Sequence, residues 1–153
     1  MNPSHLTQKL ELAMADTGPG RDLGIVTKLS PRSVLDTTTM LADLLLSRGL
    51  KLFAVIHQDA EARSVGLQLP ETVLVIFGDP LKETPLITDS RSTALDVPLR
   101  VMIWAQGGQT RISYYAPTAI ARRHGLSTGQ ARRLTAVDTL TDAVITPRLT
   151  PED

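Results

Sequence analysis

The chain contains no cysteine and few aromatic residues: Phe53, Phe77, Trp104, Tyr114 and Tyr115 are all there are. Without cysteine there can be no disulfide framework, no thiolate metal site and no thiol nucleophile. Because aromatic rings are so scarce, the core has to be built from leucine, isoleucine, valine and alanine. At 153 residues, the chain has the length of one ordinary domain with a sizeable core.

An excess of charge and a long apolar run are also missing. The 16 lysines and arginines balance the 16 aspartates and glutamates, so no global field favours nucleic acid or a membrane surface. No apolar stretch approaches the length of a membrane span. The first residues lack the basic segment and apolar core of a signal peptide. We therefore expect a cytoplasmic protein that binds neither nucleic acid nor membrane.

The sequence also lacks the short motifs of common cofactor, metal and hydrolase sites. It has neither G-x-G-x-x-G nor a Walker loop, and it has no G-x-S-x-G elbow around a serine. Paired histidines at ligand spacing and carboxylate-rich loops are absent as well. We therefore expect no cofactor and no metal site.

Turn-forming residues divide the chain. The run Asp-Thr-Gly-Pro-Gly at residues 16–20 separates an N-terminal helix or tail, residues 1–23, from the rest of the chain. Residues 24–146 are predicted to form one domain, and residues 147–153 form a C-terminal tail that starts at Pro147.

Strand-like and helical segments follow one another within this domain. The apolar pattern predicts strands near residues 24–28, 50–56, 72–77, 99–104 and 110–115. It predicts helices over residues 30–48, 59–65, 117–124 and about 128–145, and a loop over residues 79–98. The glycine-centred run at residues 105–109 is typical of a hairpin and excludes a wholly parallel sheet. The order predicts a compact α+β domain with a mixed or antiparallel sheet and helices packed over one face.

Gly78 and Asp79 follow the predicted central strand directly and precede Pro80. A glycine and a carboxylate at a strand end are typical of ligand contacts in α/β proteins. The alternative is a turn that ends the strand, in which the Asp79 side chain bonds its own backbone. Both interpretations stay open at this point.

Histidines and carboxylates supply the candidate acid–base groups. His57 ends a predicted strand, and with Asp79 or Asp96 it would form a pair able to move protons near neutral pH. His124 lies near a helix end, where it either contacts a ligand or simply interacts with the last carbonyl groups. The alternative for His57 is a hydrogen-bonding surface residue.

Rings and arginines supply the candidate binding groups. Tyr114 and Tyr115 end the last strand, so one ring should point into the core and the other outward, where it could form the floor of a pocket. We count Trp104 and Tyr114 among the ligand-binding candidates, with Gly78, Asp79 and His124. Between Asp96 and Asp138 the chain has no acidic residue but six arginines: Arg100, Arg111, Arg122, Arg123, Arg132 and Arg133. This local excess suits a small anion better than a nucleic-acid duplex.

Taken together, these motifs resemble the domain-of-unknown-function 302 family of bacterial proteins. The likeness spans most of the chain beyond the N-terminal tail, and it is densest from Phe53 to Leu126. It is carried by Gly49-Leu50, Val65-Gly-Leu67, Ile76-Phe-Gly-Asp-Pro80, Thr84-Pro-Leu86, Leu95-Asp-Val-Pro-Leu99, Trp104, Ser113-Tyr114, Pro117 and Arg123-His-Gly125. The resemblance implies a small α+β protein that forms homodimers and has no assigned catalytic activity.

The chain departs from the family pattern at two positions. Relatives often carry Gly-Asn-Pro where this chain has Asp79, and an Asp-His pair after the second strand where this chain has His57-Gln58. A one-residue displacement moves a strand side chain to the opposite face of the sheet.

Three functions are compatible with these observations. The first is a small-molecule binding or sensing domain that acts as a homodimer, with an anion as one candidate ligand. The second is an enzyme that uses His57 with Asp79 or Asp96 as acid and base. The third is a protein-interaction module whose partner surface includes the apolar segments 44–46 and 81–87.

Overall fold

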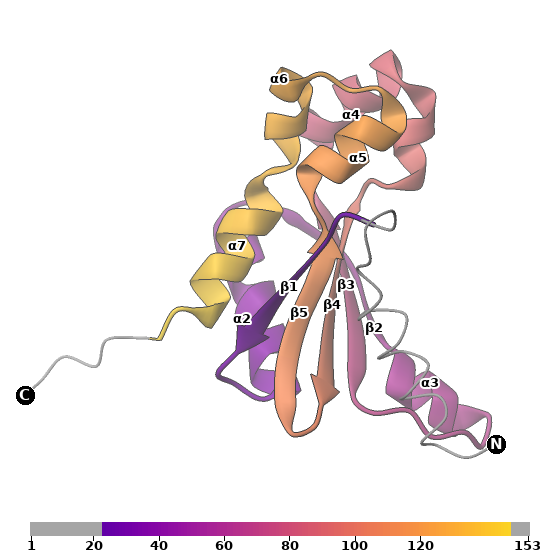
Figure 1. The fold of residues 1–153 in the computed structure, drawn as a ribbon, viewed down its shortest axis with the longest axis vertical. Coiled ribbons are helices and arrows are strands. Elements are labelled where there is room, and N and C mark those ends of the chain that lie inside the picture. The colour runs from indigo at the N-terminus through magenta and orange to yellow at the C-terminus, as the bar shows by residue number, and fades with distance from the viewer. Residues whose placement is uncertain (1–22, 148–153) are drawn as a thin grey trace, which may run out of the picture.

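The computed structural model describes residues 23–147, and their centre is one five-stranded sheet. The strands are β1 (Ile25–Ser30), β2 (Lys51–His57), β3 (Thr72–Gly78), β4 (Leu99–Gln106) and β5 (Gln109–Tyr115). Their order across the sheet is β1-β5-β4-β3-β2, and every neighbouring pair is antiparallel. The predicted α+β fold is therefore confirmed (Figure 1). The predicted tails at residues 1–23 and 147–153 lie almost wholly outside the described residues.

Helices connect the strands and complete the C-terminal part of the fold. They are α2 (Val34–Ser47), α3 (Gln58–Ser64), α4 (Pro80–Asp89), α5 (Pro117–His124), α6 (Thr128–Ala131) and α7 (Ala136–Ile145). Two short 3-10 helices, η1 (Arg91–Leu95) and η2 (Arg132–Leu134), precede β4 and α7. The predicted loop at residues 79–98 is wrong, because α4 and η1 occupy most of it.

Local signals in the sequence explain several of these boundaries. Helix α2 starts later than predicted, because the Ser33 hydroxyl, not that of Ser30, caps it by accepting the Asp36 N–H at 3.0 Å. Gly107 and Gly108 both have positive φ, 58° and 78°, which gives the two-residue hairpin turn its twist. Ser127 forms the predicted capping box with Gln130.

Helices α2 and α7 lie side by side and cover one face of the sheet (Figure 1). The core between them and the sheet is aliphatic, with Phe77 as its one phenylalanine. Leu45 and Leu86 are buried in this core, with 0% and 1% of their surface exposed. The predicted apolar partner surfaces at residues 44–46 and 81–87 are therefore not continuous patches.

The opposite face of the sheet has little cover from the described helices. Only the seven-residue α3, which buries none of its residues, lies on this side, at the corner below β2 and β3 (Figure 1). Strand alternation and the register place Ile25, Leu29, Arg111, Tyr115, Arg100, Met102, Trp104, Leu74 and Ile76 on this open face. Ile25, Leu29 and Tyr115 are 37%, 55% and 41% exposed.

The turn after β3 encloses a buried carboxyl group. Asp79 is the N-cap of α4, and its side chain accepts the Leu81 N–H at 3.1 Å. The Glu83 carboxylate turns back to accept the Asp79 N–H at 2.7 Å and is buried against Gly78. A Cβ atom at position 78 would lie 2.5 Å from Glu83 Oε1, so a larger residue there would displace the Glu83 carboxylate from the position in which it accepts the Asp79 N–H.

Burial raises the pKa of the Glu83 carboxyl above its ordinary value, and the nearby Asp79 carboxylate adds to this effect. A raised pKa means that the folded chain holds the proton more tightly than the unfolded chain. The stability that comes from proton binding is therefore present at low pH and lost as the pH rises through the folded pKa.

We predict that Glu83→Gln raises the unfolding temperature at pH 7, because glutamine keeps an acceptor for the Asp79 N–H without a buried charge. The gain should shrink as the pH falls toward about 4, where glutamate itself becomes protonated. Thermal unfolding followed by circular dichroism between pH 4 and pH 8 measures both effects. Glu71→Gln, at an exposed position, is the matched control and should change little. A gain for Glu83→Gln that does not depend on pH would contradict the explanation.

Candidate functional site

Segments distant in the sequence meet at one end of the sheet, the end at which β3 and β5 finish and β1 and β4 begin. Phe77 pairs with Leu99 there, and Tyr115 pairs with Ile25. The helices α4, α5 and α6 gather above this end (Figure 1). The end therefore collects polar groups from both the 79–98 segment and the 116–134 segment.

Four side chains from η1, the β4 entry and α5 form a hydrogen-bonded group, which we name the Asp96 cluster: Ser92, Asp96, Arg123 and His124. His124 Nε2 lies 2.5 Å from Asp96 Oδ2, and His124 Nδ1 lies 2.8 Å from Ser92 Oγ. Arg123 Nη1 donates to the same Asp96 oxygen at 2.8 Å. The imidazole is thus held at both nitrogens.

The cluster combines a buried ring with a shielded carboxylate. The His124 side chain is only 4% exposed and that of Asp96 19% exposed. Burial by itself would raise the pKa of Asp96, but hydrogen bonds from His124 and Arg123 outweigh it and hold the pKa below its ordinary value. Asp96 is therefore an anion at neutral pH.

The Asp96 cluster also joins two elements. The Ser90 hydroxyl donates to the His124 carbonyl oxygen at 2.9 Å, next to the Ser92–His124 contact. His124 is the last residue of α5, and Gly125 ends the helix in the left-handed conformation with φ of 65°. The group thus fixes the position of η1 against the end of α5.

A cavity of about 520 Å³ opens beside this cluster, between the start of β1 and helix α5. We call it the β1–α5 cavity. It is lined by Leu23, Gly24, Ile25, Val26, Tyr115, Ala116, Thr118, Ala119, Arg122 and Arg123, with no acidic residue among them. The Arg123 guanidinium lies 4.9 Å from the centre of the Tyr115 ring, so aromatic ring and cation share one wall.

Close backbone approach shapes the cavity wall. Gly24 has φ of 70°, and a Cβ atom there would lie 2.2 Å from the Ala119 Cβ. The Gly24 carbonyl oxygen accepts the Ala116 N–H at 2.8 Å. Glycine therefore allows the start of β1 to lie directly against α5, and both Gly24 and Ala119 line the cavity.

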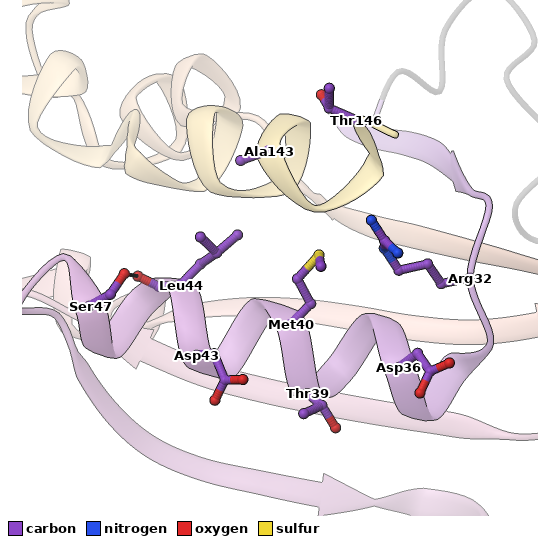
Figure 2. A pocket seen from close by; sticks show the side chains of 9 residues that line it. All are labelled: Arg32, Asp36, Thr39, Met40, Asp43, Leu44, Ser47, Ala143 and Thr146. Carbon is purple, nitrogen blue, oxygen red and sulfur yellow. Dashed lines mark hydrogen bonds between the residues drawn. The ribbon is translucent and has the colours of Figure 1, made fainter. Parts of the chain in front are cut away.

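A second cavity, of about 580 Å³, lies between α2 and α7. Figure 2 shows Met40 and Leu44 pointing from α2 toward α7, with Thr39 and Asp43 on the other side of α2. Asp36 and Asp43 oppose the single cation of this lining, Arg32, whose Nε already donates to the Val144 carbonyl oxygen at 3.3 Å. Because its lining sets two carboxylates against one arginine that is already hydrogen-bonded, this cavity is the weaker candidate for an anion.

The structure does not bring His57 together with Asp79 or Asp96. His57 pairs with Val73 at the start of β3, whereas Asp79 follows Gly78 at its other end and Asp96 precedes Leu99, the partner of Phe77. His57 is exposed and stands at the N-terminus of α3. Asp79 is engaged in capping α4.

The predicted ligand-binding residues are likewise dispersed. Trp104 pairs with Thr72 at the far end of the sheet, where its Nε1 donates to Ser113 Oγ at 2.9 Å. Tyr114 faces α7, and its hydroxyl donates to Asp138 Oδ1 at 2.6 Å. Tyr115 is the outward tyrosine of the pair and lines the cavity, as the alternation of the strand predicts.

The pairing of Asp96 with His124 is the feature that the sequence does not reveal. Both residues are candidates in the sequence, but in separate roles, and they lie 28 positions apart. Ser92 is not a candidate there, because a serine in a predicted loop carries no local signal of its role. The local signal that does point to this region is the pair of arginines Arg122 and Arg123.

Two further findings concern the described residues as a whole. Within residues 23–147, no three histidine or acidic side chains gather as metal ligands would. None of the helices in that range is long and apolar enough to cross a membrane.

Comparison with known proteins finds curated sequences and a solved structure that resemble this chain. The chain is 36% identical over 124 residues to the fluoride-specific ion channel FluC 1 of Brucella suis biovar 1 (strain 1330), a match that covers 80% of this chain and 49% of the relative. It is equally similar to the fluoride-specific ion channel FluC 2 of Brucella melitensis biotype 1, of which it covers 46%. The chain therefore spans about half the length of the curated relatives it matches.

A solved structure shares the fold. The crystal structure of an uncharacterized conserved DUF302 protein from Bacillus stearothermophilus superposes with a TM-score of 0.68, covering 80% of this chain and 95% of that one. The two sequences are only 13% identical, so this likeness concerns the fold alone. The sequence model of the domain of unknown function DUF302 matches residues 26–144, nearly the whole described chain, and the protein therefore belongs to the DUF302 family.

Proposed function

We propose that this chain is a binding or sensing domain for a small anion, which it takes up in the β1–α5 cavity. The observation that carries the proposal is the cavity lining, which contains Arg122, Arg123 and Tyr115 but no aspartate or glutamate. Arginine suits a carboxylate or a phosphate group because its planar guanidinium donates two parallel hydrogen bonds. A cytoplasmic location, as the sequence predicts, is part of the same proposal.

The two arginines differ in the partners that they already have within the fold. Arg123 donates to Asp96 and lies over Tyr115, so much of its charge is compensated. Arg122 is exposed, and no side chain or carbonyl group among residues 23–147 accepts a hydrogen bond from its guanidinium. Arg122 is therefore the cation that an incoming anion would meet first, with Arg123 and the Tyr115 ring behind it.

The curated relatives favour the same chemistry. Their names describe channels for fluoride, which is a small anion, and this chain matches about half of their length. A domain that recognises anions would be a fitting sensor beside an anion channel. For this chain, 80% of which matches these relatives, sensing or binding of an anion is the function we infer.

We predict that a small anion raises the unfolding temperature of the chain and that Arg122→Ala abolishes most of this response. A ligand at 100 times its dissociation constant adds about 2.7 kcal/mol to stability. Loss of one charged hydrogen-bonding partner should weaken binding by roughly tenfold or more. Thermal shift with fluoride, acetate, citrate, sulfate and inorganic phosphate, at matched ionic strength in sodium chloride, measures both effects.

Arg133→Ala is the matched control, because Arg133 is an exposed arginine on η2 outside the cavity. It should respond to the anion as the unmodified chain does. The proposal fails if none of the five anions stabilises the chain, or if the two arginine variants lose the response equally.

We also propose that the chain acts as a homodimer and that the open face of the sheet is its contact surface. The exposed apolar side chains of Ile25, Leu29 and Tyr115 on this face support the proposal, since contiguous apolar surface often marks a partner site. A second copy would cover it, in line with the dimers that the family resemblance implies. A stable dimer buries at least about 1,000 Å² in total.

Leu29→Glu tests the dimer. Light scattering at micromolar concentration should give twice the mass of one 16.6 kDa chain for the unmodified protein and a single chain for this variant. Arg111 pairs with Leu29 across the strands and can form an ion pair with the new carboxylate, so the fold should survive. Leu81→Glu, at a position 85% exposed on α4, is the control and should remain dimeric. A mass of one chain for the unmodified protein would refute the proposal.

The other two functions gain less from the structure. The enzyme with His57 as its base has no convergent site, since His57 lies at the other end of the sheet from Asp79 and Asp96. A protein-interaction module would use the same open face as the homodimer, and the light-scattering experiment addresses that surface directly.

A further inference from the structure

Ser92, His124 and Asp96 are hydrogen-bonded in series. Ser92 Oγ lies 2.8 Å from His124 Nδ1, and the other ring nitrogen, Nε2, lies 2.5 Å from Asp96 Oδ2. A hydroxyl beside an imidazole that a carboxylate orients is the arrangement by which proteins activate serine as a nucleophile. Both distances are within hydrogen-bond reach.

The nucleophile of such a series has to be open to solvent, and the exposed fractions of the three side chains differ accordingly. Ser92 is exposed at the start of η1, whereas the His124 ring is 4% exposed. The Asp96 carboxylate is also shielded, and it is held as an anion by Arg123. The hydroxyl is therefore open to a substrate, while most of the surface of the two side chains behind it is buried.

The imidazole orientation fixes the proton positions. With Asp96 ionised, Nε2 carries the proton that it donates to the carboxylate, which leaves Nδ1 free to accept the Ser92 hydroxyl proton. The two ring nitrogens exchange the roles they have in serine proteases. The chemistry is equivalent, because either nitrogen of a neutral imidazole is basic when the other one carries hydrogen.

We propose that Ser92 is an acyl-accepting nucleophile, with His124 as its general base and Asp96 as the residue that positions His124. The substrate class is an ester with a short acyl chain. The exposed Ser92 hydroxyl lines neither the α2–α7 cavity nor the β1–α5 cavity, and the cavity of about 40 Å³ beside Asp96 is too small to hold a long chain. This activity goes beyond anion binding and does not require it.

The reaction balances without a cofactor. Ser92 Oγ forms a bond to the carbonyl carbon while its proton passes to His124 Nδ1. The bond from that carbon to the leaving alkoxide breaks, and the alkoxide takes the proton from His124 as an alcohol. Water then attacks the acyl-serine in the same way, gives a carboxylic acid and restores the Ser92 hydroxyl.

A fluorophosphonate probe tests the proposal on the full chain. Ser92 Oγ should displace fluoride from phosphorus, and intact-mass spectrometry should then show one adduct, which peptide mapping places on Ser92. Ser92→Ala should lose the adduct. Ser64→Ala should keep it, because Ser64 is an exposed serine on α3 whose hydroxyl donates only to the Glu61 carbonyl oxygen, away from the Asp96 cluster.

Asp96→Asn separates positioning from a purely structural role. It should lower the limiting rate of labelling by roughly 100-fold and leave the half-saturating probe concentration unchanged, with the rate referred to the folded fraction measured by circular dichroism. Absence of an adduct on the unmodified chain, an adduct at another residue, equal loss in both serine variants, or an unchanged rate in Asp96→Asn would each overturn the proposal.

Discussion

The strict alternation of side chains along β5 is the constraint on which the rest of the structure depends. Because α2 and α7 cover one face of the sheet, Ile112 and Tyr114 must point into the core, and Arg111 and Tyr115 must point to the open face. A shift of one residue would exchange these sets. The two adjacent tyrosines therefore have unrelated roles: Tyr114 bonds α7 through Asp138, and Tyr115 lines the β1–α5 cavity.

Tyr114 also shows how the covered face tolerates polar groups. Lys28 on β1 lies 5.1 Å from the Tyr114 ring centre and donates to Asp142 at 2.7 Å and to Thr141 at 2.8 Å. Burial lowers the pKa of Lys28, but the hydrogen bonds to Asp142 and Tyr114 outweigh this, and the net pKa is raised. Polar groups at this edge of the core are thus paired with one another and anchor α7 to β1.

The sequence predicts those parts of the fold that rest on local signals. The hairpin at Gly107 and Gly108, the capping box at Ser127 and the direction of Tyr115 all follow from neighbouring residues. Helix α4 is not predicted, because Pro80 and Pro85 suggest a loop. In the structure, Asp79 caps the helix and Pro80 occupies its first turn. The pairing of Asp96 with His124 depends on the tertiary contact of η1 with α5, which no local pattern reports.

The excess of arginine between Asp96 and Asp138 shows why a charge run in a sequence is not yet a binding surface. Three of the six cations have partners within the fold: Arg100 donates to the Leu95 carbonyl oxygen, Arg111 lies 5.7 Å from the Trp104 ring centre, and Arg123 pairs with Asp96. Arg132 and Arg133 lie on η2, outside the cavity. Among these six, Arg122 alone combines an uncompensated charge with a place in a concave, acid-free surface. The balanced total charge produces no strong electrostatic field, which would also attract nucleic acid. Selectivity for an anion would then come from one arginine and the shape of the cavity around it.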